Sequence, residues 1–190
     1  MIQEALAQRV LEAALETGGD FSELFMEDTE SHSISMLNGT VENAAYRRRT
    51  GAGVRVLKGE QSAYAYTADT SEAALLEAAR GAAAVLEGKK GQEAAVATTK
   101  RPAAYAPQIP FDTVDNQRRI QLLRRGTAAA QAQSGEITRV VAGYGDVDQR
   151  ILVCNSQGVW AEDRRPHRRG GGGRRGIPDR RGAAGGGEGL

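Results

Sequence analysis

Apolar and polar residues alternate along residues 50–67, on both sides of a Lys58-Gly59-Glu60 turn. Before the turn, two valines point to one side and Arg55 to the other. After it, Tyr64 and Tyr66 share one face, opposite two alanines. A period of two is typical of half-buried strands, and the turn glycine supplies backbone freedom. The stretch therefore predicts a β-hairpin at the centre of an antiparallel sheet, with Arg55, Tyr64 and Tyr66 as candidates for contact with a partner or substrate.

The residues before this hairpin predict one helix and three further strands. Apolar positions at helical spacing predict an amphipathic helix over residues 2–15. Residues 21–27 predict a buried strand, and residues 31–37 alternate as a second one. Asn38-Gly39 then predicts a type I′ turn, from which residues 40–46 return antiparallel.

After residue 67 the apolar period changes from two to about 3.6, which indicates a helix. Asp69, Thr70 and Ser71 are candidate N-caps for this helix, which is expected to end at Gly88. Residues 88–110 contain three prolines and little periodicity, so they predict a linker.

The fold class follows from the order of the remaining elements. A second long helix is expected over residues 113–134, and strands return over residues 136–163, with a turn at residues 155–158. Long helices between runs of hairpin-linked strands predict an α+β fold. The expected arrangement is a mainly antiparallel sheet of hairpins with the two longer amphipathic helices packed on one side.

The chain changes character at Arg164. From there onward eight arginines accompany two acidic residues, a net charge of +6, whereas the preceding residues sum to −5. The same segment has no aromatic residue and few large aliphatic ones, so it cannot offset the entropy of ordering its backbone. The predicted organisation is an N-terminal α+β domain at 1–87, a linker at 88–112, a helix-plus-hairpin region at 113–163 and a disordered tail at 164–190.

Two sequence stretches carry a resemblance to a known family. GAGVRVLKGEQSAYAYTADTSEAALLEAA joins a glycine-flanked strand, a turn, a small-aromatic strand and an acidic helix start, and ILVCNSQGVWAED joins two strands through an Asn-Ser-x-Gly turn. Both resemble the amino-terminal region of the TldD/PmbA family, on its TldD side, and the resemblance covers roughly residues 2–163. Those proteins are zinc metallopeptidases, historically described as modulators of DNA gyrase.

The resemblance implies that the catalytic zinc belongs to a part of the family that this chain does not match. The family's zinc lies on a helical His-Glu-x-x-x-His motif, with a further Cys ligand, in the carboxy-terminal half. Here the only histidines are His32 and His167, and neither maps onto the motif. We therefore expect no catalytic or metal-binding residue in this chain, and zinc only in the full-length family protein.

The isolated candidates for chemistry have simpler structural interpretations. His32 is expected to be a core or face-lining residue of its strand, and His167 has no assignable role. Cys154 follows an apolar run and is expected to be an inert buried thiol. The arginines at 47–49 predict a solvated strand end, with contact to an anionic partner as the alternative.

Two functions are compatible with these features. The first is an N-terminal fragment of a TldD-like metallopeptidase, frameshifted after about residue 164, that cleaves peptides or unfolded proteins together with a PmbA-like subunit or the missing carboxy-terminal half. The second is a non-catalytic protein-binding α+β module whose basic tail could contact nucleic acid. The acidic body itself argues against nucleic-acid binding.

Sequence features also predict where the protein resides. There is no apolar run near the roughly 18 residues that a membrane helix requires, and no signal peptide is visible. A single cysteine agrees with a reducing compartment. The expected location is the cytoplasm.

Overall fold

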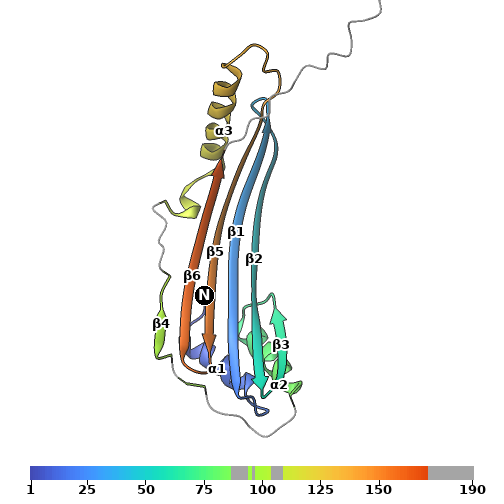
Figure 1. The fold of residues 1–190 in the computed structure, drawn as a ribbon, viewed down its shortest axis with the longest axis vertical. Coiled ribbons are helices and arrows are strands. Elements are labelled where there is room, and N and C mark those ends of the chain that lie inside the picture. Colours follow the sequence, from blue (N-terminus) through green and yellow to red (C-terminus); the bar gives the residue numbers. More distant parts are fainter. Residues whose placement is uncertain (87–93, 96, 104–108, 171–190) are drawn as a thin grey trace, which may run out of the picture. The chain divides into compact units, whose positions relative to one another are not determined.

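The computed structural model describes residues 1–86, 94–95, 97–103 and 109–170. Within them, six strands form one sheet in the order β3-β2-β1-β5-β6-β4, mostly antiparallel, with β4 parallel to β6 (Figure 1). The elements in chain order are α1 (Glu4–Ala14), β1 (Phe21–Leu37), β2 (Thr40–Lys58), β3 (Gln61–Thr67), α2 (Glu72–Ala84), β4 (Thr99–Arg101), η1 (Phe111–Thr113), α3 (Asn116–Gln131), β5 (Val141–Asn155) and β6 (Val159–Gly170). The predicted α+β fold class is confirmed.

The chain folds into two compact units built from separated segments. Unit 1 comprises Met1–Ser31, Arg47–Gln108 and Val147–His167, and unit 2 comprises His32–Tyr46, Ile109–Asp146 and Arg168–Leu190. Strands β1, β2, β5 and β6 each contribute residues to both units. Each unit has its own hydrophobic cluster.

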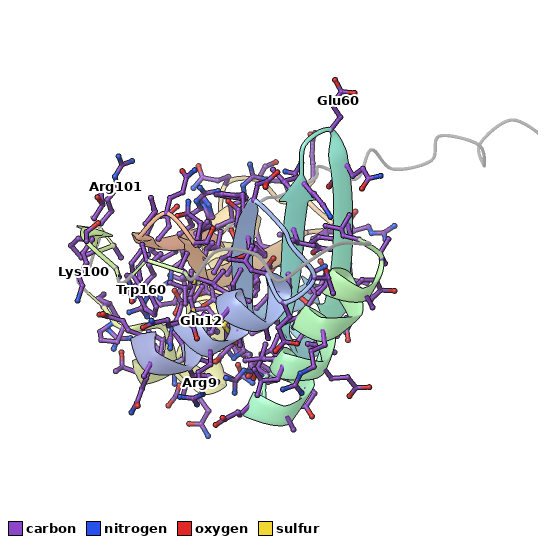
Figure 2. All side chains as sticks on the ribbon, turned by 90° about the horizontal axis from the view of Figure 1, so that it is seen from below. Arg9, Glu12, Glu60, Lys100, Arg101 and Trp160 are labelled. Carbon is purple, nitrogen blue, oxygen red and sulfur yellow. The ribbon has the colours of Figure 1, made fainter. Side chains whose placement is uncertain are left out.

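In unit 1, α1 and α2 lie side by side on one face of the strands (Figure 2). Their apolar stripes close over the inward-facing residues of β1, β2, β3 and β5. Ser71 is the N-cap of α2, because its hydroxyl accepts a hydrogen bond from the Ala74 N–H at 3.4 Å. Asp69 instead orients the cap, since its carboxylate accepts the Ser71 N–H at 2.8 Å. The large side chains that are fully buried in this unit are Leu15, Leu24, Leu75, Leu152, Val10, Val54 and Val56.

The β2–β3 hairpin forms as predicted, but its predicted place in the sheet is wrong. Val54 pairs with Ala65 and Arg55 with Tyr64, in antiparallel register. β3 is the outermost strand at one edge of the sheet, and β1 and β5 occupy the middle. The period-two pattern reports which face of a strand is buried. It does not report how many strands flank it.

The strands are also longer than the sequence patterns indicated. β1 runs for 17 residues and β2 for 19, where each was expected to be two shorter strands. The polar residues that looked like a break in β1 are paired across strands instead, since Asp28 binds the Arg48 guanidinium at 2.9 Å. The connection between β1 and β2 is confirmed as a type I′ turn, with φ of 47° at Asn38 and 84° at Gly39.

Two segments that were expected to lack regular structure contain strands. β4 falls inside the predicted linker and pairs with Val159, Trp160 and Ala161 of β6. β6 continues through Arg164 to Gly170, so the prediction of disorder is wrong for residues 164–170. Composition could not reveal the neighbouring strand or the buried acid that holds Arg164. The remainder of the predicted tail, 171–190, lies outside the described residues.

Unit 2 places α3 against its strands through a narrow buried stripe of Arg119, Leu123 and Thr127. Its apolar cluster consists of Ile34, Met36, Leu123, Ala142 and Tyr144. Asp115 caps α3, because its carboxylate accepts the Arg118 N–H at 2.7 Å. The two longer helices, α2 and α3, therefore belong to different units, and the helix that packs against α2 is α1.

Candidate functional site

A buried polar cluster in unit 2 is centred on Asp146, whose side chain is 1% exposed. One carboxylate oxygen, Oδ2, accepts hydrogen bonds from Arg119 Nε at 3.2 Å and Nη2 at 3.1 Å, and from the Tyr144 hydroxyl at 2.8 Å. The other, Oδ1, accepts the His32 backbone N–H at 3.2 Å and lies 3.0 Å from the His32 ring Nδ1. Both carboxylate oxygens are thus engaged by protein groups.

The strand and helix periods bring these groups together. Alternation along β5 directs Tyr144 and Asp146 to its buried face, and α3 presents Arg119 one turn before Leu123. The His32 ring packs near two aromatic rings, with centroid distances of 4.8 Å to Phe111 and 5.1 Å to Tyr46. His32 was expected to line a strand face, and this is confirmed.

The electrostatics of this cluster favour a structural role. Burial raises the pKa of Tyr144, and its hydrogen bond to Asp146 raises it further, while Arg119 acts in the opposite direction. The Arg119 side chain is only 3% exposed and neutralises the carboxylate in place. A metal cation at Asp146 would have to compete with that guanidinium, so the cluster is a buried ion pair rather than an open cation site.

A second buried aspartate, Asp148, lies on β5 in unit 1. Its carboxylate accepts hydrogen bonds from Arg164 Nη2 at 2.7 Å and Nε at 2.9 Å, and from Arg150 Nη2 at 3.2 Å. The hydrogen bond from Arg164 is the largest cause of the lowered pKa of Asp148. These contacts anchor the first residue of the segment that was expected to be disordered.

Cys154 behaves as the sequence predicted. It is 2% exposed, and burial raises the pKa of its thiol to about 12. Its neighbours form a pocket of about 160 Å³ between α1 and the sheet, next to Leu11 and Trp160. A thiol that remains protonated at neutral pH is neither a nucleophile nor a ready metal ligand.

The candidates for partner contact lie together on the outer face of the β2–β3 hairpin, opposite the core. Tyr64 and Tyr66 are 60% and 82% exposed, and Arg55 pairs in register with Tyr64. The Tyr64 ring covers Gly53, where any side chain would collide with it. Arg55 Nε donates a hydrogen bond to the Ser62 hydroxyl at 3.4 Å. The structure thus brings the three candidates together, and their contact with a partner stays a prediction.

The sequence did not single out Arg119, Asp146 or Asp148. The available signal was polar residues at buried positions of otherwise regular patterns, as with Arg119 in the apolar stripe of α3. His167 is exposed on β6, and no histidine pair at helical spacing is present. The arginines at 47–49 lie within β2 rather than at a strand end.

The described part of the chain does not fit a catalytic zinc site. No group of three or more His, Cys, Asp or Glu side chains that could hold a metal ion occurs in it. A catalytic zinc needs three protein ligands and an open position for water.

No helix within the described ranges is long and apolar enough to cross a membrane.

These features define an α+β domain protein whose buried aspartates are engaged in structural ion pairs. Two family models match the chain in succession, and together they span more than half of it. The PmbA/TldA metallopeptidase domain 1 matches residues 22–86, and the PmbA/TldA metallopeptidase central domain matches residues 109–177. The chain belongs to the PmbA/TldD metallopeptidase family.

Individual relatives agree with this assignment. The chain is 27% identical over 150 residues to a metalloprotease TldD homologue of Haemophilus influenzae, and 24% identical over 148 residues to one of Buchnera aphidicola. Each alignment covers 77% of this chain and 31% of the relative. The chain therefore spans about a third of the length of the curated relatives it matches.

Solved structures show the same fold at lower identity. A crystal structure from Thermotoga maritima, of a protein proposed to modulate a DNA gyrase, has a TM-score of 0.67 and 14% identity. It covers 87% of this chain, which spans 38% of that protein. TldE from Thermococcus kodakarensis has a TM-score of 0.63 and 15% identity, covering 85% of this chain and 37% of its own. At such identities the likeness concerns the fold alone.

Proposed function

We propose that this chain supplies the amino-terminal and central-domain portion of a TldD-type zinc metallopeptidase that cleaves peptides or unfolded proteins. The observation that carries the proposal is the succession of domain 1 and central-domain matches along one chain. The metalloprotease name of the relatives supports zinc chemistry in the whole protein. The ligands of that zinc would lie in sequence that this chain does not contain.

In this proposal the chain's own residues act as a scaffold. Asp146 with Arg119, and Asp148 with Arg164, hold their elements in place, and none of them is available to activate a water molecule. The partner would be a PmbA-like subunit or a carboxy-terminal catalytic half, with which the chain forms a heterodimer or a single protein. We place the protein in the cytoplasm, in agreement with its single free cysteine.

The test combines metal analysis with a peptide-cleavage assay on the purified 190-residue chain. We expect no stoichiometric zinc and no chelator-sensitive cleavage, and no change in zinc content in the His32→Gln variant. Adding the carboxy-terminal half of the Haemophilus relative should be required for any zinc-dependent activity. One tightly bound zinc with chelator-sensitive turnover by the chain alone would show that the chemistry lies in these residues after all.

The same purified protein also tests the alternative function, a non-catalytic binding module whose basic end contacts nucleic acid. Under the proposal, single-stranded nucleic acid should bind only weakly, because the body is acidic, and this binding should be lost at physiological salt. Tight binding that survives physiological salt, together with no gain of activity from a carboxy-terminal half, would favour the alternative.

A further inference from the structure

The two edges of the sheet differ in a way that bears on binding. β4, at one edge, has three residues, and two of them are the cations Lys100 and Arg101. Figure 2 shows Arg101 projecting outward from this edge. Short strands and charged side chains are common means of protecting an edge from pairing with another chain. β3, at the other edge, has seven residues without a charge or a proline.

The register of the hairpin determines which backbone groups of β3 face outward. Lys58 and Gln61 flank a two-residue turn whose Gly59 has φ of 54°, so they form the closing pair of the hairpin. Antiparallel pairs alternate between hydrogen-bonded and non-hydrogen-bonded ones from that point. Ser62, Tyr64 and Tyr66 therefore direct their N–H and C=O groups away from β2, toward the open edge.

The side chains of the same residues offer a surface beside that edge. Tyr66 stands opposite Gly53, whose missing side chain leaves room that the Tyr64 ring occupies. Tyr66 is consequently 82% exposed, with no side chain opposite it on β2. Cross-strand neighbours stabilise aromatic side chains in sheets, and an added strand on the open side of β3 would supply such a neighbour. Glu60 projects away from the strands at the turn (Figure 2).

We infer that the outer edge of β3 binds an extended peptide segment, which joins the sheet as a further strand. Backbone groups of Ser62, Tyr64 and Tyr66 would supply affinity, and the side chains would supply preference, as in other cases of strand addition. The tyrosines favour aromatic or aliphatic residues at alternate positions, and Arg55 favours a neutral or acidic segment over a basic one.

Size argues for a peptide rather than a second copy of the chain. Stable protein interfaces bury roughly 1,200–2,000 Å² in total, and edge pairing through one seven-residue strand falls well short of that. A separate extended peptide needs no larger surface, because its backbone pairs along its whole length. The inference concerns binding alone, so it can hold or fail independently of zinc or cleavage.

The experiment measures binding of a fluorescent, end-blocked heptapeptide, TVEVYVT, to the full chain by anisotropy, with chelator present. Two further peptides carry N-methyl groups on alternate backbone amides, in the two possible phases. Saturable binding is expected for the parent peptide and for one of the two phases, because only one phase blocks the groups that face β3. Replacing the peptide's Glu by Lys should weaken binding through Arg55.

Protein variants tie the binding to β3. Tyr66→Lys, which adds the kind of charge that β4 carries, should weaken binding about tenfold or more. Val85→Lys is the matched control, since Val85 is 68% exposed at the C-cap of α2, and this variant should bind as the unchanged protein does. Equal binding of both methylated peptides, equal loss in the two variants, or no saturable binding up to millimolar peptide would overturn the inference. So would a stable dimer that Tyr66→Lys dissociates, because the occupant would then be a second copy.

Discussion

Asp146 and Asp148 are two residues apart on β5, and both are buried, yet they are neutralised differently. Asp146, in unit 2, pairs with Arg119 of α3, which is 3% exposed. Asp148, in unit 1, pairs with Arg150 and Arg164, whose side chains are 44% and 27% exposed. The first pair is withdrawn from water as a whole, whereas the second keeps its cations in contact with solvent.

This difference in solvent exposure determines the desolvation cost of each ion pair, and the two pairs also fix different elements of the fold. Removing both charges of Asp146 and Arg119 from water is expensive, so the pair depends on its full set of hydrogen bonds. It fixes a helix against strands, and Tyr144 and His32 complete it. The arginine partners of Asp148 remain partly solvated, and this ion pair fixes the end of a strand instead. The buried pair should therefore be the less tolerant of substitution.

The largest effect is expected from Arg119→Met, which leaves the Asp146 carboxylate buried without its cation. Loss of one partner of a buried ion pair typically costs about 3–5 kcal/mol of the free energy of unfolding. Urea denaturation followed by circular dichroism measures this. Arg118→Met, at an exposed neighbouring position of α3, is the control and should stay within about 0.5 kcal/mol. Equal losses of unfolding free energy in the two variants would mean that the buried ion pair stabilises the fold no more than an exposed arginine does.

A smaller effect is expected from Arg164→Met, about 2 kcal/mol, because Asp148 keeps Arg150 and the lost hydrogen bonds were charge-assisted. The lowered pKa of Asp148 sets the pH dependence. Its stabilising contribution is complete above the unfolded-state value near 3.8 and is lost as the pH falls through the lower folded-state pKa. The difference between the two proteins should thus shrink in acid.

The control for this prediction is Arg165→Met, since Arg165 pairs with Asp163 and both side chains are largely exposed. It should leave the free energy of unfolding nearly unchanged. Hydrogen exchange adds a second measurement: within residues 164–169, the amides that point toward β5 should be protected in the unchanged chain and lose protection in Arg164→Met. Pro166 has no amide hydrogen and reports nothing. Unprotected amides in both would restore the expectation that disorder begins at Arg164.

The smallest effect is expected from Tyr144→Phe, which removes the hydroxyl that donates to Asp146 at 2.8 Å. Asp146 then keeps Arg119 and His32, so the loss should be about 1 kcal/mol. Combined with Arg119→Met, the two losses should not add, because both residues serve the same carboxylate oxygen. Strict additivity in this double-mutant cycle would mean that the two contacts are independent.

Much of the local structure was determined by the sequence. The type I′ turn at Asn38-Gly39, the hairpin around Gly59 and the cap at Ser71 depend on neighbours within a few residues, so short-range patterns predict them. The same holds for the shared face of Tyr64 and Tyr66, which follows from a period of two. Family membership was also readable, because two stretches preserve the order of such local elements.

Other features were decided only by the tertiary structure. Asp146 finds Arg119 at a separation of 27 residues and His32 at 114, and no local pattern contains either pairing. The edge position of β3 depends on which strands flank β2. The continuation of β6 beyond Arg164 goes together with the contact between Arg164 and Asp148 of β5. Periodicity fixes which side of an element is buried. Which distant residues meet there is fixed by packing, because a buried charge is stable only where the fold brings its partner.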